Sequence, residues 1–184
     1  KGKLIWIHAA SVGESLSVLP VIQRLLHEDA ALNILITTVT VNSAKMMQER
    51  LPERAIHQFV PVDSLEPVKK FLAHWKPDMA IWVESELWPG LIDCAAAVCP
   101  VLLINARMSD TSYRYWQMVL AFSKALQRRF TFILAQTRRD MERYQRLGAQ
   151  QVIYSGNIKY DAPPLPGDKS KIQDLEIAIG ERPV

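Results

Sequence analysis

Apolar residues along this chain fall into seven short runs, separated by longer segments of helical character. Most of the runs are continuous rather than alternating, which is typical of strands that are covered on both faces of a sheet. The expected strands cover residues 4–8, 32–38, 56–62, 79–83, 101–104, 130–135 and 152–154. The pattern therefore predicts a sheet that is buried between helices.

Six helical segments lie between these runs, at residues 15–27, 43–50, 67–75, 87–98, 113–127 and 138–147. Gly148 directly follows the last of them, as expected at a helix C-terminus. Strands that alternate with helices imply right-handed crossover connections and parallel pairing. The predicted fold class is α/β, with a doubly wound parallel sheet.

The length of 184 residues fits one domain with an appended tail. We expect the domain to occupy residues 1–160. The segment DAPPLPGD, residues 161–168, is proline-rich and predicts a stiff linker, and the KSKIQDLEIAIG that follows has a helical pattern. Residues 161–184 are therefore expected to form a linker and the start of a second domain. The chain, which begins without methionine, is expected to be part of a longer protein.

Composition narrows the class of protein without identifying it. With 49% hydrophobic and 22% charged residues, the chain can bury a substantial core and is not of the disordered class. A net charge of +3 is too small to indicate nucleic-acid binding, and no nucleic-acid partner is expected. Cys94 and Cys99 match no metal-ligand spacing and are expected to be buried thiols in a reducing compartment. No apolar run approaches the length of ~20 residues that spans a bilayer.

Ligands of open parallel sheets bind beyond the carboxyl ends of the strands, so the residues after each strand are the first candidates for chemistry. The first strand is followed by HAASVGES, residues 8–15, which lacks both the G-x-G-x-x-G fingerprint and the P-loop pattern. Glu14 stands where a phosphate would meet the helix, which excludes nucleotide binding at this loop. Its carboxylate either stabilises the helix dipole or acts as a general base, with the dipole lowering its pKa and Gly13 leaving room for a substrate.

Two further strand ends carry polar side chains. In VESELWPG, Glu84 and Glu86 form a paired site, cap the following helix or are solvated, and no metal pair is expected because Asp and His residues do not cluster nearby. In NARMSDTSYRYW, Arg107, Ser109 and Arg114 combine guanidinium and hydroxyl groups that suit recognition of a phosphate or a carboxylate.

The motifs HAASVGE, VESELWPGLI, NARMSDTSYRYW and SGNIKYD, in this order, resemble the N-terminal half of the lipid A Kdo transferases of Gram-negative bacteria, where Kdo is 3-deoxy-D-manno-octulosonic acid. The resemblance implies a glycosyltransferase of the GT-B type, in which two Rossmann-like domains face each other across a cleft. It implies that this half binds the acceptor, lipid IVA, and that a missing C-terminal domain binds the donor, CMP-Kdo. The complete enzyme is then expected to act in lipopolysaccharide biosynthesis at the cytoplasmic face of the inner membrane, and the isolated chain to be inactive.

Carried over to matching positions, the resemblance makes Glu14 the general base that deprotonates the acceptor hydroxyl. The residues that it assigns to acceptor binding are Ser11, Gly13, Glu84, Glu86, Arg107, Ser109 and Arg114. It places Lys159 at the hinge between the two halves, on the donor side. No metal and no other cofactor are expected.

A membrane surface is an expected partner, because lipid IVA is amphiphilic and anionic. The helix at residues 16–26 carries more apolar side chains than one core-facing stripe needs, so it either contacts the membrane or packs deep in the domain. Two other functions stay open: a different sugar-nucleotide enzyme with the same half-fold, which differs in its donor, and a non-catalytic binding module. The binding module predicts that Glu14 and Arg107 tolerate substitution.

Overall fold

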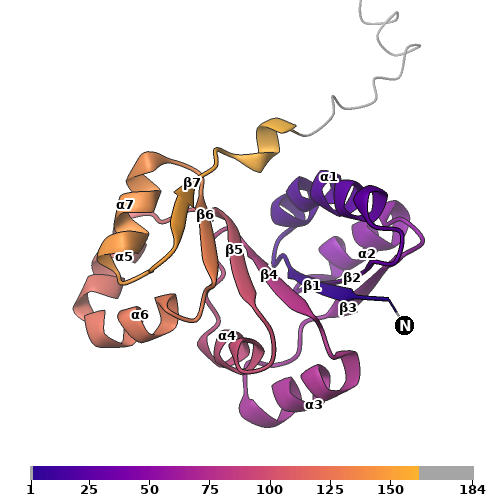
Figure 1. Cartoon of the computed structure of the whole chain (residues 1–184), viewed down its shortest axis with the longest axis horizontal. Helices are drawn as coiled ribbons and strands as arrows, with labels where there is room; N and C mark the ends of the chain where they lie inside the picture. The colour runs from indigo at the N-terminus through magenta and orange to yellow at the C-terminus, as the bar shows by residue number, and fades with distance from the viewer. Residues whose placement is uncertain (1, 162–184) are drawn as a thin grey trace, which may run out of the picture.

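A computed structural model describes residues 2–161 and contains one parallel sheet of seven strands. The strands are β1 (Leu4–His8), β2 (Asn33–Thr38), β3 (Ala55–Phe59), β4 (Met79–Val83), β5 (Val101–Ala106), β6 (Phe132–Ala135) and β7 (Val152–Tyr154). Their order across the sheet is β3-β2-β1-β4-β5-β6-β7, so the chain begins in the middle, builds one half, and crosses over to build the other (Figure 1). The predicted doubly wound parallel sheet is confirmed, and the fold is Rossmann-like.

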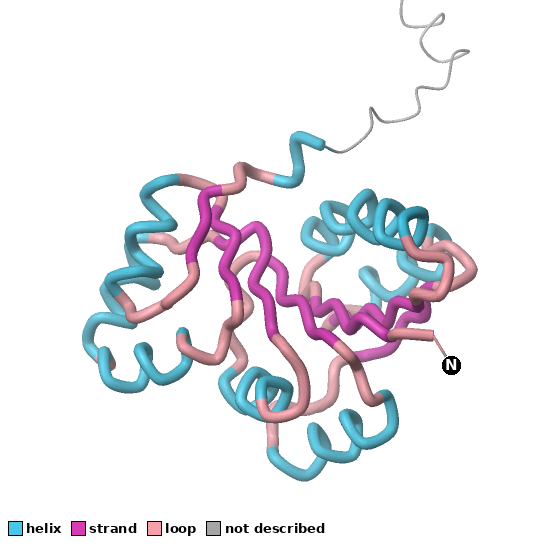
Figure 2. Tube along the Cα trace, viewed as in Figure 1, coloured by secondary structure: helices cyan, strands magenta, loops and turns pink. Residues whose placement is uncertain are grey.

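Helices cover both faces of the sheet (Figures 1 and 2). On one face lie α1 (Val12–Glu28) and α2 (Val41–Arg50). The other face is covered by α3 (Leu65–Trp75), α4 (Pro89–Ala96), α5 (Asp110–Met118), α6 (Leu120–Gln127) and α7 (Arg138–Arg146). A short 3₁₀ helix, η1 (Ile158–Asp161), follows β7 and lies against α1. The linker and second-domain start expected at residues 161–184 lie outside the described residues, apart from residue 161.

Successive side chains of a strand point to opposite faces, and the two cores follow from this alternation. In β1, Trp6 packs among the residues beneath α3 and α4, whereas Ile7 packs among those beneath α1 and α2. The ring centroids of Trp6 and Trp82 are 5.0 Å apart, which joins β1 to β4 on the α3–α4 side. The buried cores hold the strand ends in register, and the carboxyl ends of all seven strands form one edge.

The segment predicted as one helix at residues 113–127 consists of two helices. The break is at Val119, whose backbone angles, φ −112° and ψ 42°, are not helical. Beyond it, α6 turns Ser123 and Leu126 into the core, while Met118, Val119 and Leu120 at the junction stay exposed. The one-helix prediction was wrong because tertiary packing overrides the good helix propensity of these residues.

Most of the apolar residues of α1 belong to the core, and Val12 at its start is exposed. Leu19, Ile22 and Leu26 are buried, and Leu16 and Leu25 pack partly buried against the same cluster. The structure therefore favours deep packing of this helix over membrane contact. None of the helices in residues 2–161 is long and apolar enough to cross a bilayer.

Candidate active site

Glu14 lies in the first turn of α1, beyond the carboxyl end of β1. The hydroxyl oxygen of Ser11, the N-cap residue, accepts a hydrogen bond from the Glu14 backbone N–H (3.3 Å), and its hydrogen is donated to Glu14 Oε1 (2.8 Å). Glu14 Oε2 accepts a hydrogen bond from the backbone N–H of Ala10 (2.9 Å). The arrangement is a variant of the capping box, with the carboxylate reaching back over the start of the helix. Both oxygens are thereby fixed, and the residue is only 7% exposed.

Burial raises the pKa of the Glu14 carboxyl above its usual value, and this effect outweighs the hydrogen bonds from Ser11 and Ala10, which lower the pKa. The negative charges of Glu86 and Glu84 raise the pKa further. The expectation of a lowered pKa, which considered the helix dipole alone, was therefore wrong for the carboxyl as a whole, because desolvation and two nearby carboxylates raise the pKa. A carboxylate with a raised pKa is the stronger proton acceptor, which suits a general base.

Glu84 follows β4 with a left-handed backbone, φ +61°, a conformation that costs a non-glycine residue about 1–2 kcal/mol. Its Oε1 forms an ion pair with Lys159 Nζ at 2.5 Å and lies 3.5 Å from Nδ2 of Asn105. Asn105, near the end of the neighbouring β5, is also left-handed, with φ +53°, and its Oδ1 accepts a hydrogen bond from the Ile158 N–H (3.2 Å). Two adjacent strand ends thus hold η1, which brings Lys159 to this edge of the sheet.

Glu86 is half-buried and accepts a hydrogen bond from the indole Nε1–H of Trp88 (2.8 Å). The side-chain cap of α4 comes from the β3–α3 connection, where Asp63 Oδ1 accepts a hydrogen bond from the Leu91 N–H (2.6 Å). Within the described residues, neither Glu84 nor Glu86 caps this helix, so that alternative for the two glutamates was wrong.

His8, the last residue of β1, is fully buried. Its Nδ1 lies 3.0 Å from Thr37 Oγ1, whereas its Nε2 has no hydrogen-bond partner among the described residues. The rings of Trp82 and Trp88 lie 5.8 and 5.7 Å from the imidazole, centroid to centroid. Burial lowers the pKa of His8 to about 4, so the ring is neutral at pH 7. His8 supports Trp88, the residue that binds Glu86.

Arg107, Ser109 and Arg114 form a second group after β5. Ser109 is the N-cap of α5, and its Oγ accepts a hydrogen bond from the Ser112 N–H (3.1 Å). Arg107 and Arg114 are exposed and form no ion pair with any described residue. Within residues 2–161, no hydrogen bond or ion pair joins these three side chains to Glu14.

The predicted site residues therefore separate into two groups at one edge of the sheet. The first group is gathered around the N-terminus of α1 and the end of β4, and comprises Ser11, Gly13, Glu14, Glu84, Glu86 and Lys159. At Gly13 a Cβ atom would meet nothing within 4 Å, so there is open space beside this group. Across residues 2–161, no three His, Cys, Asp or Glu side chains are arranged to hold a metal ion.

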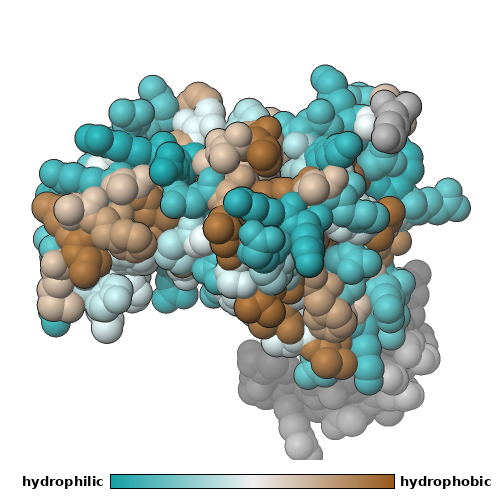
Figure 3. All heavy atoms as spheres, turned by 90° about the horizontal axis from the view of Figure 1, so that it is seen from below, coloured by the Kyte–Doolittle hydropathy of each residue, from teal (hydrophilic) through white to brown (hydrophobic). Residues whose placement is uncertain are grey.

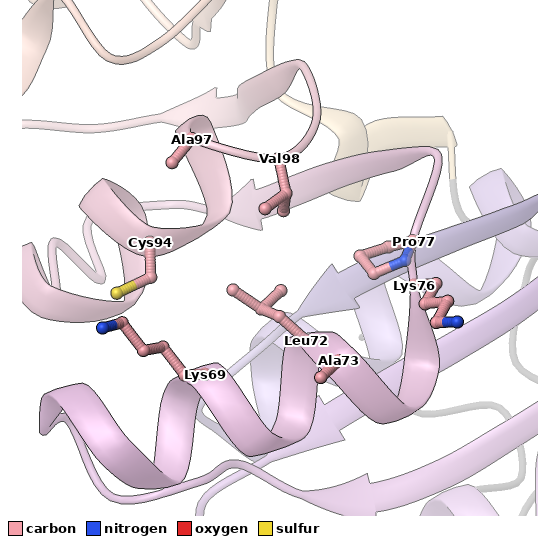
Figure 4. Close-up of a pocket in the computed structure, with 8 residues that line it drawn as sticks. All are labelled: Lys69, Leu72, Ala73, Lys76, Pro77, Cys94, Ala97 and Val98. Carbon is pink, nitrogen blue, oxygen red and sulfur yellow. The ribbon is translucent and has the colours of Figure 1, made fainter.

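A pocket of about 460 Å³ lies between α3 and α4, near the amino end of β4, and none of the predicted site residues lines it (Figure 4). Its lining is mainly apolar, with Lys69 beside Cys94 at one end and Lys76 beside Pro77 at the other. Cys94 and Cys99 are free thiols, as expected, but both are half-buried rather than buried.

A Rossmann-like domain with ionisable side chains gathered at the carboxyl edge of its strands, and with a carboxylate in place of a glycine-rich phosphate loop, is of the class that binds its ligand at that edge. Residues 1–162 match the family described as 3-deoxy-D-manno-octulosonic-acid transferase. The chain belongs to this Kdo transferase family.

Relatives of this chain carry the same family name. A 3-deoxy-D-manno-octulosonic acid transferase of Rickettsia felis is 39% identical over 181 residues, which cover 98% of this chain and 39% of that protein. A probable mitochondrial 3-deoxy-D-manno-octulosonic acid transferase of Arabidopsis thaliana is 36% identical over 191 residues, covering 100% of this chain and 43% of that protein. The chain thus spans about two fifths of the length of these relatives.

Solved structures with the same fold are larger as well. The UDP-GlcNAc 2-epimerase of Neisseria meningitidis matches with a TM-score of 0.64 at 17% identity, over 97% of this chain and 52% of that one. MurG of Acinetobacter baumannii matches with a TM-score of 0.55 at 11% identity, over 84% of this chain and 45% of that one. At these identities the likeness concerns the fold alone.

Sequence reasoning missed several residues that shape this edge. Asp63 and the pair Asp140 and Arg143 lie far along the chain from the segments that they hold. A usable signal existed for Asp140, since Thr137 precedes it by three positions in a capping-box pattern. The left-handed backbone of Asn105 also had a signal, because asparagine tolerates this conformation better than most residues.

Proposed function

We propose that this chain is the acceptor-binding domain of an enzyme that transfers Kdo from CMP-Kdo to lipid IVA, with Glu14 as the general base. Membership of the Kdo transferase family supports the reaction. The observation that carries the assignment of the base is the Glu14 carboxylate itself, which is buried, fixed by two hydrogen bonds, and raised in pKa at the carboxyl edge of the sheet.

In the proposed reaction, Glu14 accepts the proton of an acceptor hydroxyl while the hydroxyl oxygen forms a bond to the anomeric carbon of Kdo. The bond between that carbon and the phosphate oxygen of CMP-Kdo breaks, and CMP leaves with the electron pair. The proton stays on Glu14 until it is lost to solvent. Open space beside Gly13 supports the entry of the acceptor at this point. The proposal includes no metal ion and no other cofactor.

The proposal divides the protein into two halves. Residues 1–160 form the acceptor-binding domain, and residues 161–184 form the linker and the start of a donor-binding domain. The two domains together make a GT-B enzyme. Lys159 supports this division, because it pairs with Glu84 at the edge of the sheet just before the proposed linker. Glu84 and Glu86 border the acceptor site, and the exposed guanidinium groups of Arg107 and Arg114, with the Ser109 hydroxyl, suit an anionic group of the acceptor. The chain without the donor-binding domain is then inactive.

A membrane-facing surface is part of the proposal, at the cytoplasmic face of the inner membrane. Exposed apolar side chains gather at the α5–α6 junction, namely Tyr115 (57% exposed), Met118 (76%), Val119 (37%), Leu120 (39%) and Phe122 (52%). In Figure 3, apolar side chains cluster at the end of the molecule where α6 lies. Patches of this kind mark contact with membranes or partners, and the α5–α6 patch, unlike α1, points its apolar groups outward.

Phe122→Asp tests the membrane surface, with Val98→Asp as the matched control at another exposed apolar position. Sedimentation with vesicles of phosphatidylethanolamine and phosphatidylglycerol is expected to show weaker binding for Phe122→Asp and unchanged binding for Val98→Asp. Equal binding of the two variants would remove the α5–α6 patch from the proposal.

Glu14→Gln in the complete gene product tests the base, because the substitution keeps the size of the side chain and removes its basicity. Transfer of Kdo from CMP-Kdo to lipid IVA is expected to fall by about 10²-fold or more. The matched control is Glu28→Gln at the other end of α1, where the carboxylate is exposed and pairs with Arg24. Full activity of Glu14→Gln would make Glu14 a helix cap and move the search for the base to Glu84 and Glu86. A wild-type protein that transfers nothing from CMP-Kdo would refute the reaction itself.

A further inference from the structure

The connection from β5 to α5 is held by side chains from the β6–α7 region, about thirty residues further along the chain. Asp140 Oδ1 accepts a hydrogen bond from the Met108 N–H (2.8 Å), and Arg143 donates one to the Met108 carbonyl (2.5 Å). The Tyr144 hydroxyl donates to the Arg107 carbonyl at 3.3 Å. Backbone groups that would normally form hydrogen bonds with water in a surface connection thus form them with side chains on one face of α7.

The same helix face also fixes the start of α5. Arg143 forms an ion pair with Asp110 in addition to its bond to Met108, and its guanidinium lies over the Tyr113 ring, 5.2 Å from the centroid. Arg139 pairs with the same Asp110 carboxylate at 2.7 Å. The hydrogen bond from Arg143 and the charge of Arg139 lower the pKa of the Asp110 carboxyl, as expected for a carboxylate that accepts from two guanidinium groups.

Burial separates the members of this network. Asp140 and Arg143 are 6% and 8% exposed, whereas the side chain of Arg139 is 70% exposed. Buried hydrogen bonds to a charged group hold a backbone more rigidly than an exposed ion pair does, because water does not compete for them. Met108 is itself buried, so both of its backbone groups depend on these two partners.

Arg107 is the residue whose position this arrangement fixes. Its carbonyl accepts a hydrogen bond from Tyr144, the N–H of the same peptide bond (that of Met108) donates to Asp140, and the next carbonyl along the chain (that of Met108) accepts from Arg143. The Arg107 side chain itself is exposed and forms no ion pair among residues 2–161. We infer that Asp140 and Arg143 are positioning residues, which fix the backbone of residues 107–110 so that the Arg107 guanidinium meets an anionic group of the acceptor. The identity of the ligand in this inference rests on the proposed function, whereas the positioning network does not.

The network is tested on the 184-residue chain alone, by amide hydrogen exchange followed by NMR. Asp140→Ala, Asp140→Asn and Arg143→Lys remove or weaken the bonds to Met108, and Arg139→Ala is the matched control on the same helix. Exchange of the Met108 amide is expected to be about tenfold or more faster in Asp140→Ala, less so in Asp140→Asn, and unchanged in Arg139→Ala. Amides of β4 report whether the whole domain has been destabilised. Should the Met108 amide exchange alike in all variants while β4 stays protected, the network has no positioning role. If Asp140→Ala does not fold, Asp140→Asn and Arg143→Lys decide the question by the same measure.

The functional consequence is tested in the complete gene product by the split between KM and kcat. For Arg143→Lys, KM for lipid IVA is expected to rise about tenfold with kcat within about twofold of the wild type, because binding geometry is lost and the base is untouched. Arg107→Ala is expected to give the same split, and Arg139→Ala neither effect. A KM within about twofold of the wild type for Arg143→Lys overturns the inference. A wild-type enzyme without activity bears on the proposed reaction alone, since the exchange measurement needs no turnover.

Discussion

Replacement of His8 by phenylalanine changes how the stability of this domain responds to acid. His8 is fully buried between Trp82 and Trp88, and its imidazole is close to one hydrogen-bonding side chain, Thr37. Burial lowers its pKa from the usual 6.5 to about 4. The phenyl ring keeps the aromatic packing and removes the titrating group, so the comparison isolates the proton.

The size of the effect follows from the two pKa values of His8. Well above pH 6.5 the imidazole is neutral in both the folded and the unfolded protein, and it makes no pH-dependent contribution. Between about pH 6.5 and pH 4 the unfolded state binds a proton that the folded state does not, so acidification lowers the free energy of unfolding. The loss amounts to about 2 kcal/mol between pH 7 and pH 5, and reaches about 3 kcal/mol below pH 4.

Urea unfolding followed by tryptophan fluorescence measures this loss, since the chain contains five tryptophans. The wild type is expected to lose about 2 kcal/mol more than His8→Phe between pH 7 and pH 5, whatever the difference between them at pH 7. The raised pKa of Glu14 contributes with the opposite sign, but it is common to both proteins and cancels. His74→Phe, at an exposed position, controls for the exchange of one ring for another. Equal losses in wild type and His8→Phe would refute a buried, neutral imidazole.

The other predictions concern two backbone positions. Asp63→Ala removes the cap of the Leu91 N–H and is expected to lower the free energy of unfolding by about 1 kcal/mol. Asp63→Asn keeps a hydrogen-bond acceptor and is expected to lose less. Urea unfolding distinguishes the two variants, and an equal loss of stability in both would show that the cap does not matter. Gly148→Ala is expected to lower the free energy of unfolding by more than about 1 kcal/mol, because φ is +102° and the new Cβ would lie 3.0 Å from the Lys124 Cα. The control is Gly13→Ala, whose new Cβ would have nothing within 4 Å and which is expected to lose no stability in the same urea unfolding.

The strands were the part of this fold that sequence predicted best. Continuous apolar runs identified β1, β4 and β7 with their observed ends. For β1 and β4 the reason is burial on both faces, which leaves no polar alternation to blur the limits of a strand. The run of β7 is apolar although Ile153 and Tyr154 are exposed at the edge of the sheet. The end of β5 was predicted at residue 104, whereas the strand continues to Ala106 past an irregular register. Asn105 is the reason, because a polar residue after an apolar run indicates the end of a strand. In the structure Asn105 has a left-handed backbone, and the pairing resumes after it at Ala106.

The site was predicted as a set of residues but not as a geometry. That parallel strands bring their carboxyl ends to one edge was enough to place Glu14, Glu84 and Glu86 together. It gave no indication that Lys159 would neutralise Glu84, because the contact spans 75 positions of sequence and depends on how η1 returns over the sheet. Nor did it give the direction of the Glu14 pKa, which depends on burial and on neighbouring charges rather than on the helix to which the residue belongs.

Two helices of this domain begin with the same device, and their comparison shows what distinguishes a structural carboxylate from a candidate base. In α7, Thr137 is the N-cap and Asp140 the buried acid three positions later, just as Ser11 and Glu14 are in α1. The Asp140 carboxylate bonds a backbone N–H of another segment, Met108, and thereby joins two elements. Both bonds of Glu14 are instead made within residues 10–14, so its carboxylate links α1 to nothing else among the described residues. Burial and two nearby carboxylates disfavour its charge, and open space lies beside Gly13. A purely structural acid gains nothing from such a position, whereas a proton acceptor does.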